Sequence, residues 1–242
     1  EDLIRKTDQW MKAYPKSPTP YIAKAMALKS EAWTIRGTGY ANTVATDAWK
    51  PFHEKIEQSR ATLEQSKLIS NNDPHWYAAM ADIATIQSWE ETDFKKLLDE
   101  GYVKYPNYYQ MYFNAMIYYT PKWKGNANKV ELFASEILEK TKPKEGFSLY
   151  ARIYWAASQT QFQGKLFENS KVRWNIMSKG IDDVLKKYPD QWNINSFALF
   201  SCLAQDKEKA KKLISLIEYP PISSAWLGSI ENYTYCKTWV EQ

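Results

Sequence analysis

Residues 101–109 read Gly-Tyr-Val-Lys-Tyr-Pro-Asn-Tyr-Tyr and contain the pattern that decides the fold. Helical spacing of apolar residues stops there at the proline, because the residue before a proline avoids helical backbone angles. A second apolar run begins directly behind it. The same step recurs after other segments of helical spacing, at Tyr14-Pro15, Tyr188-Pro189 and Tyr219-Pro220, with Asp73-Pro74 in an equivalent place. Helices that stop at a proline and restart behind it indicate stacked helical hairpins.

The spacing of the prolines supports a repeat. Pro74 and Pro106 are 32 residues apart and Pro189 and Pro220 are 31 apart, close to the roughly 34 residues of a two-helix repeat. Aligned on their prolines, the units match by side-chain class rather than by identity. We therefore predict an all-α protein, a tetratricopeptide-like array of antiparallel helical hairpins that forms an α-solenoid or curved helical bundle. We expect one domain over residues 1–242, because no linker rich in Gly, Ser or Pro divides it.

Two kinds of helix are expected to alternate. Phe94, Leu97 and Leu98 begin a stripe on one helix face, whereas residues 108–119 are apolar on nearly every side and predict a helix between neighbours. No segment alternates strictly between apolar and polar residues as a strand does. The predicted helices are 2–13, 19–36, 47–70, 75–88, 91–104, 107–119, 127–141, 147–162, 168–187, 190–204, 207–218 and 222–240, the last broken near Gly228.

The composition excludes some partners and leaves the compartment open. The 32 basic and 28 acidic residues give a net charge of +4, too balanced to indicate a nucleic-acid partner. No apolar run reaches the roughly 20 residues of a transmembrane helix. The chain begins at Glu1 rather than at methionine, as a processed or trimmed product would. We expect a periplasmic or envelope location slightly more than a cytoplasmic one.

The two cysteines allow two interpretations. Cys202 and Cys236 are 34 residues apart, one repeat length, so stacking would place them on neighbouring helices. In an oxidising compartment they could form a disulfide. The alternative is two small buried apolar residues, since Cys202 lies within an apolar run.

Signals for catalysis, metal binding and cofactor binding are not found. There is no nucleophile elbow, no glycine-rich phosphate loop and no Cys-x-x-Cys. His53 precedes Glu54, but no second histidine follows at the spacing of a zinc helix. Glu90 and Glu91 could act as a carboxylate pair, yet acidic residues also favour a helix start. We expect no enzyme and no cofactor.

Two loops are candidates for contact with a partner or ligand. In the first, Trp33 and Arg36 precede Gly37, a natural helix C-cap; they could anchor an interface, or Arg36 could bond loop carbonyls. The second is residues 120–126, an extended turn that carries Trp123. An aromatic-walled pocket could also form from residues of this loop and of the all-round apolar helices. Its candidates are Tyr118, Trp123, Arg152, Tyr154 and Trp155.

An ordered series of short motifs resembles a known family. The series begins with Trp10 and Tyr14-Pro15-Lys16-Ser17 and continues through Trp33-Thr34-Ile35-Arg36-Gly37, Asp73-Pro74, Tyr105-Pro106, Pro121-Lys122-Trp123-Lys124-Gly125-Asn126, Phe133-Ala134 and Tyr150-Ala151-Arg152-Ile153-Tyr154. It resembles the bacterial family catalogued as domain of unknown function 4034, over roughly residues 5–210. The family most often has a small residue or histidine where Lys124 stands. The resemblance implies a tetratricopeptide-like helical protein without an established activity.

Two classes of function fit these observations. The first is a non-enzymatic scaffold that binds another protein, for example a bacterial immunity protein on a secreted toxin or effector; helical-pair arrays offer a concave surface for a partner segment. The mild positive charge argues against a strongly basic nuclease as that partner. The alternative is an enzyme or small-ligand binder in the bacterial envelope, with a pocket for glycan or peptidoglycan fragments.

Overall fold

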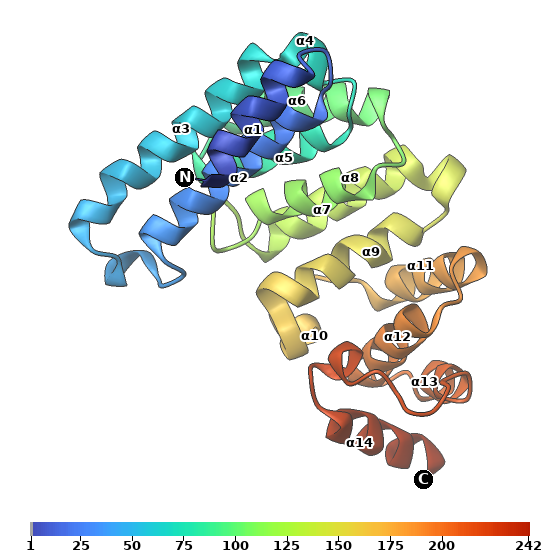
Figure 1. Ribbon diagram of the computed structural model, residues 1–242. Coiled ribbons are helices and arrows are strands. Elements are labelled where there is room, and N and C mark those ends of the chain that lie inside the picture. The colour runs from blue at the N-terminus through green and yellow to red at the C-terminus, as the bar shows by residue number, and fades with distance from the viewer. Residues whose placement is uncertain (1) are drawn as a thin grey trace. The chain divides into compact units, whose positions relative to one another are not determined.

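The computed structural model describes residues 2–242, and none of them lies in a β-strand (Figure 1). The all-α prediction is confirmed. Contacts between residues divide the chain into two compact units, residues 1–118 and 119–242, which are described separately below. The expectation of a single domain over residues 1–242 stays a prediction.

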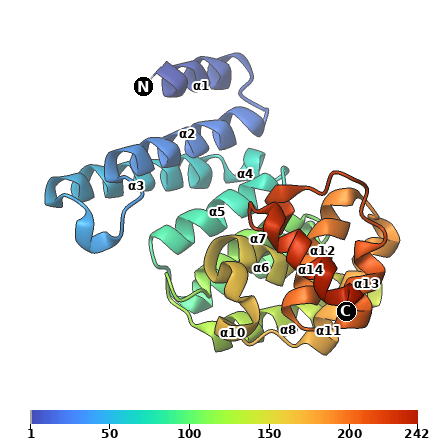
Figure 2. The same ribbon diagram turned by 90° about the horizontal axis from the view of Figure 1, so that it is seen from below.

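Unit 1 contains seven α-helices among its described residues. They are α1 (Asp2–Ala13), α2 (Thr19–Arg36), α3 (Trp49–Gln65), α4 (Lys67–Ser70), α5 (His75–Ile86), α6 (Glu91–Lys104) and α7 (Tyr109–Tyr118). Helix α2 lies between α1 and α3, with α1 at one edge (Figure 2). Helix α5 packs against α3, α6 and α7. Nine of its twelve residues are buried, so α5 forms the centre of this unit's core.

Unit 2 is also helical in its described residues. Its helices are α8 (Ala127–Glu145), α9 (Ser148–Ala157), α10 (Leu166–Asn169), α11 (Trp174–Lys187), α12 (Gln191–Leu203), α13 (Lys207–Ile214) and α14 (Ile230–Glu241). Helix α9 packs against α8 and α11, and α12 packs against α13 and α14. Trp226, fully buried ahead of α14, donates its indole N–H to Asn195 on α12 at 2.9 Å. This buried hydrogen bond helps to hold the last turns of the unit on α12.

Most predicted helix starts agree with the structure, and the exceptions have local causes. The helix predicted over 168–187 is interrupted, and its main part begins at Trp174. The Ser170 hydroxyl accepts a hydrogen bond from the backbone amide of Val172, and this local bond competes with helical geometry. The predicted helix 47–70 is divided at Ser66, and 207–218 ends at Ile214. The expected break near Gly228 is confirmed: Gly228 has φ 78° and separates a short 3-10 turn from α14.

Side-chain hydrogen bonds recur between residues about one repeat length apart. In unit 1, Tyr105 donates to the Asn71 carbonyl at 3.0 Å, across 34 residues. In unit 2, Trp174 donates to Asp206 at 2.9 Å, across 32 residues. Further bonds join Ser59 to Ala25, Asn114 to Ala78 and Trp226 to Asn195, with separations of 34, 36 and 31 residues. These five bonds connect helices or turns within one unit, and whether they reflect a regular repeat stays a prediction.

The cysteines belong to this series of contacts. Cys202 on α12 and Cys236 on α14 form a disulfide, with their Cα atoms 6.0 Å apart. Cys236 is completely buried. Of the two interpretations left open by the sequence, the structure contains the bridge.

Candidate functional site

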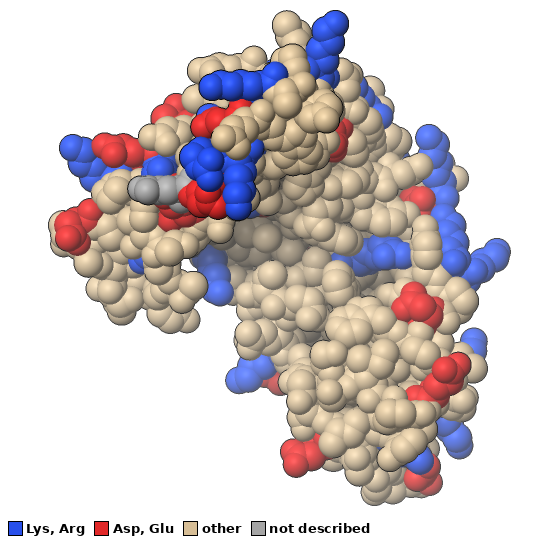
Figure 3. All heavy atoms as spheres, in the orientation of Figure 1, with Lys and Arg blue, Asp and Glu red and all other residues tan. Residues whose placement is uncertain are grey.

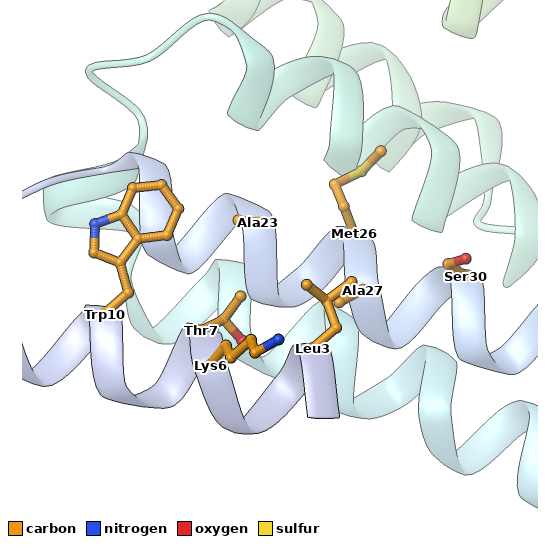
Figure 4. Close-up of a pocket in the computed structure, with 8 residues that line it drawn as sticks. All are labelled: Leu3, Lys6, Thr7, Trp10, Ala23, Met26, Ala27 and Ser30. Carbon is orange, nitrogen blue, oxygen red and sulfur yellow. The ribbon is translucent and has the colours of Figure 1, made fainter. Parts of the chain in front are cut away.

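An apolar groove runs between α1 and α2 at the edge of unit 1 (Figure 4). Each helix contributes four residues at the spacing i, i+3, i+4, i+7, which places them on one helix face. They are Leu3, Lys6, Thr7 and Trp10 from α1, and Ala23, Met26, Ala27 and Ser30 from α2. The helices run in opposite directions, so Trp10 lies near Ala23 and Leu3 near Ala27. We call this feature the α1–α2 groove.

The depth of the groove follows from side-chain size. Ala23 and Ala27 leave space along the middle of α2, while Leu3, Trp10 and Met26 project as its walls (Figure 4). The volume of this open groove is about 360 Å³. Leu3 is 60% exposed and Trp10 is 40% exposed. Large apolar side chains gathered around one hollow indicate a binding surface more than singly scattered ones do.

Lys6 is the one charged side chain among the residues that line the groove. Its ammonium lies 2.6 Å from Asp2, and Arg5 contacts the same carboxylate. These side chains are more than half exposed, so the ion pairs contribute little free energy and can exchange partners. The groove therefore offers an apolar surface for burial beside an exposed lysine whose ion pair is with Asp2.

The first predicted loop is stabilised from within the chain. The Arg36 guanidinium lies 5.0 Å from the ring centres of both Trp33 and Trp49, a cation–π arrangement. It also donates hydrogen bonds to the carbonyls of Gly37 and Gly39 at 3.1 and 3.0 Å. Gly37 caps α2 as expected, with φ 77°. Arg36 thus closes the turn after α2, and contact of Trp33 or Arg36 with a ligand stays a prediction.

The second predicted loop is compact, and the expectation of an extended turn is wrong. The amides of Trp123 and Gly125 both donate to the Thr120 carbonyl. A Cβ at Gly125 would overlap the Tyr119 backbone, so only glycine allows this tight turn. Trp123 is half-buried in it.

The other predicted pocket residues each have identifiable neighbours within their own unit. In unit 1, Tyr118 is buried, stacks on Phe94 at 4.1 Å and donates to the Trp89 carbonyl. In unit 2, the Arg152 guanidinium lies 4.9 Å from the Tyr188 ring. Tyr154 points instead to the carboxylate of Glu131. Trp155 is half-buried on the same helix. Within unit 2, Arg152 and Tyr154 therefore contact different neighbours, and a pocket that they share stays a prediction.

Glu131 is the centre of the most connected polar cluster of unit 2, which we call the Glu131 cluster. One carboxylate oxygen accepts from Tyr150 at 2.7 Å and from Tyr154 at 2.5 Å. The other accepts from Arg173 at 2.7 Å and from Ser135 at 3.0 Å. Burial, reinforced by the hydrogen bonds to Glu131, raises the pKa of both tyrosines. The cluster joins α8, α9 and the segment before α11, so its evident role is to stabilise the unit.

Other polar surfaces offer less to a ligand. A second hollow lies between α11 and α13, but Lys209 fills part of it and bonds Asp182 at 2.8 Å and the Ser178 carbonyl at 2.7 Å. Charges of both signs are mixed over the face drawn in Figure 3, with broad uncharged areas between them. Residues 2–242 contain no group of three or more side chains placed to hold a metal ion. The α1–α2 groove is therefore the candidate functional site.

Sequence reasoning did not identify the groove. Among the sequence motifs, Trp10 belongs only to the family resemblance, and neither Leu3 nor Met26 belongs to any motif. A usable signal existed, because Leu3, Thr7 and Trp10 follow helical spacing. The exposure of Leu3 and Trp10 depends on packing between helices, which the spacing of one helix does not reveal.

Comparisons with known proteins give no relative from which a role could be transferred. No family model, no curated protein and no solved structure matches the chain. The resemblance to family 4034 therefore stays an expectation. Over the described residues, every helix is too short or too polar to cross a membrane.

Proposed function

We propose that the protein is a non-enzymatic helical-repeat scaffold that binds another protein through the α1–α2 groove. The observation that carries this proposal is the exposure of Leu3 and Trp10 beside an unfilled apolar hollow. Tryptophan is among the residues that most often dominate binding energy at protein interfaces. The walls of the groove come from two regular helices, which makes the surface pre-organised and lowers the entropy lost on binding.

The scaffold part of the proposal is a tetratricopeptide-like arrangement of helical hairpins. Within unit 1, α5 pairs with α6; within unit 2, α9 pairs with α11 and α12 with α13. The side-chain bonds at intervals of 31 to 36 residues support a repeat of one helical pair. The resemblance to family 4034 is compatible with this arrangement.

The concrete partner that we favour is a secreted bacterial toxin or effector, with the protein acting as its immunity protein. Charge narrows the choice of effector. Residues 1–118 contain 14 basic and 15 acidic residues, whereas residues 119–242 contain 18 and 13. Neither unit is strongly acidic, which argues against a basic nuclease as the partner. The disulfide supports an oxidising location such as the periplasm.

The alternative proposal, a pocket for a glycan or peptidoglycan fragment, has less support. Sugars need several convergent polar groups, whereas the α1–α2 groove is lined mainly by apolar side chains. The residues first considered for an aromatic-walled pocket point to different neighbours, as Arg152 and Tyr154 do. A thermal shift that saturates with a small glycan would favour this alternative.

The test is co-purification from cells of the source organism with groove variants. Met26→Arg places a charge in the hollow, and Trp10→Ala removes a wall. We expect each to reduce recovery of the partner by about tenfold or more. The matched control is Leu68→Arg, which changes a leucine that is 91% exposed on α4, outside the groove. Equal recovery of the partner with the unmodified protein and with all three variants would contradict the proposal, provided that circular dichroism shows unchanged helix content.

A further inference from the structure

Three-helix contacts recur inside each unit, and helix α1 is the exception in the described structure. In unit 1, α5 lies against both α6 and α7. In unit 2, α12 lies against both α13 and α14. In each case one helix covers the following two helices of the chain. Within the described structure, the extensive packing of α1 is with α2. The hollow between α1 and α2 is where a third helix could pack against both, as α5 packs against α6 and α7.

From this correspondence we infer that the α1–α2 groove binds an amphipathic α-helix of a partner protein, with an apolar stripe and an acidic flank. This inference rests on the proposed scaffold function and specifies the partner's chemistry.

The dimensions fit a helix. The lining residues extend from Leu3 to Trp10 on α1 and from Ala23 to Ser30 on α2, which is about two helical turns or about 10 Å. Alanines at the base allow the axis of a third helix to approach closely, and Met26 can adjust to its side chains. Apolar residues at i, i+3, i+4 and i+7 of the incoming helix would meet both walls.

Charge decides between an acidic and a basic helix. Lys6 is the charged side chain that lines the groove, and Arg5 directly precedes it on the same helix. Both basic groups share the single carboxylate of Asp2, at distances of 2.6 and 2.5 Å. A second carboxylate from the partner would therefore be attracted to this wall, whereas a lysine would be repelled.

Extended peptides fit less well. A strand that binds by β-augmentation needs an edge of unpaired backbone amides and carbonyls. Both walls of the groove are helices, whose internal backbone groups are bonded within the helix. The groove offers a strand side-chain contacts alone.

The test uses three fluorescently labelled peptides and the full-length protein, with anisotropy as the readout. The first peptide is a helix of about four turns with a leucine and alanine stripe flanked by glutamates. The second has lysines in place of the glutamates. The third has the composition of the first with its apolar residues in strict alternation. We expect the first peptide to bind most tightly and the third at least about tenfold more weakly.

Variants make the assignment specific. We expect Trp10→Ala, which changes an exposed side chain, and Met26→Arg to weaken the first peptide by about tenfold, and Leu68→Arg to leave its binding unchanged. Lys6→Glu should invert the preference between the glutamate and lysine peptides. Equal binding of the helical and alternating peptides, or no binding of any peptide, would overturn the inference. So would an uninverted charge preference, or self-association of the protein that Trp10→Ala abolishes.

The two proposals can fail separately. If Trp10→Ala and Met26→Arg still abolish recovery of the natural partner while no helical peptide binds, the scaffold function stands and the helical occupant is wrong. If neither partner recovery nor peptide binding responds to these variants, both are wrong.

Discussion

The edge helices of the two units are held in different ways. Helix α1 in unit 1 buries only Thr7 among its described residues and leaves Leu3 60% and Trp10 40% exposed. Helix α14 in unit 2 buries Cys236 and Val240 and is tied to α12 by the disulfide. Its Asn232 side chain also donates a hydrogen bond to the Trp226 carbonyl at 2.9 Å. A covalent link compensates for the small buried surface of α14. Helix α1 has no such link in the described structure, and its apolar face remains open to a partner.

The polar clusters around Glu100 in unit 1 and Glu131 in unit 2 also differ, and the cluster of unit 2 is again the more tightly held. In unit 1, Glu100 accepts from Tyr77 and Lys67, each at 2.8 Å, and the Glu100 and Lys67 side chains are 42% and 43% exposed. In unit 2, the Glu131 side chain is 17% exposed and accepts four hydrogen bonds. A more buried carboxylate with more donors contributes more when all of them are satisfied. We therefore expect the cross-links of unit 2 to be the stronger ones.

Removal of the disulfide should have the largest effect on the difference in stability between the edge helices α1 and α14. The bridge closes a loop across 34 residues, and constraint of the unfolded chain over that length stabilises the folded state by about 4 kcal/mol. We expect Cys202→Ala combined with Cys236→Ala to increase hydrogen exchange throughout α14. Exchange in α1 should not change. If α14 stays as protected as in the bridged protein, its other contacts suffice and the contrast between the two edges is wrong.

Loss of the Glu131 carboxylate should have the second-largest effect on stability. Glu131→Ala leaves the hydroxyls of Tyr150 and Tyr154 without their acceptor and the Arg173 guanidinium without its ion pair. We expect the free energy of unfolding of unit 2 to fall by about 3 kcal/mol, measured by urea unfolding. Glu139→Ala, at an exposed position of the same helix, is the matched control. A similar loss in both variants would show that the cluster adds nothing specific.

The sequence predicts the helix starts and the proximity of the cysteines, but it does not predict the Glu131 cluster or the α1–α2 groove. Prolines and helical spacing locate helix starts such as Thr19 and Glu91, because those signals act within a few residues. The 34-residue cysteine spacing placed Cys202 and Cys236 on neighbouring helices. The Glu131 cluster and the α1–α2 groove depend on helix rotation and on which face stays uncovered. Those properties arise from packing between distant segments, which single-helix periodicity does not contain.

Alkaline titration should reveal the buried tyrosines. The pKa values of Tyr150 and Tyr154 are raised by burial and by the Glu131 carboxylate, so both phenols stay protonated in the folded state above their unfolded pKa of about 10. Their contribution to stability is complete below that pH and is lost as the pH rises above it, by up to about 1.4 kcal/mol per tyrosine and pH unit. Urea unfolding between about pH 9 and pH 11 should show this slope, and Tyr154→Phe should reduce it. An equal slope in the variant would mean that Tyr154 ionises equally well in both states.

Acid titration of Glu100 should give the smallest effect, because its side chain is half-solvated. Burial raises its pKa, but the hydrogen bonds from Lys67 and Tyr77 outweigh burial and leave the pKa lowered. A lowered folded pKa stabilises the protein above the unfolded value of about 4.3, and this contribution disappears as the pH falls through the folded pKa. Glu100→Gln should therefore reduce the stability of unit 1 by less than about 1 kcal/mol at neutral pH and make its loss below about pH 4.3 shallower. Glu54→Gln, at an exposed position of α3, is the matched control. A Glu100→Gln effect as large as that of Glu131→Ala would mean that exposure does not set the strength of the two clusters.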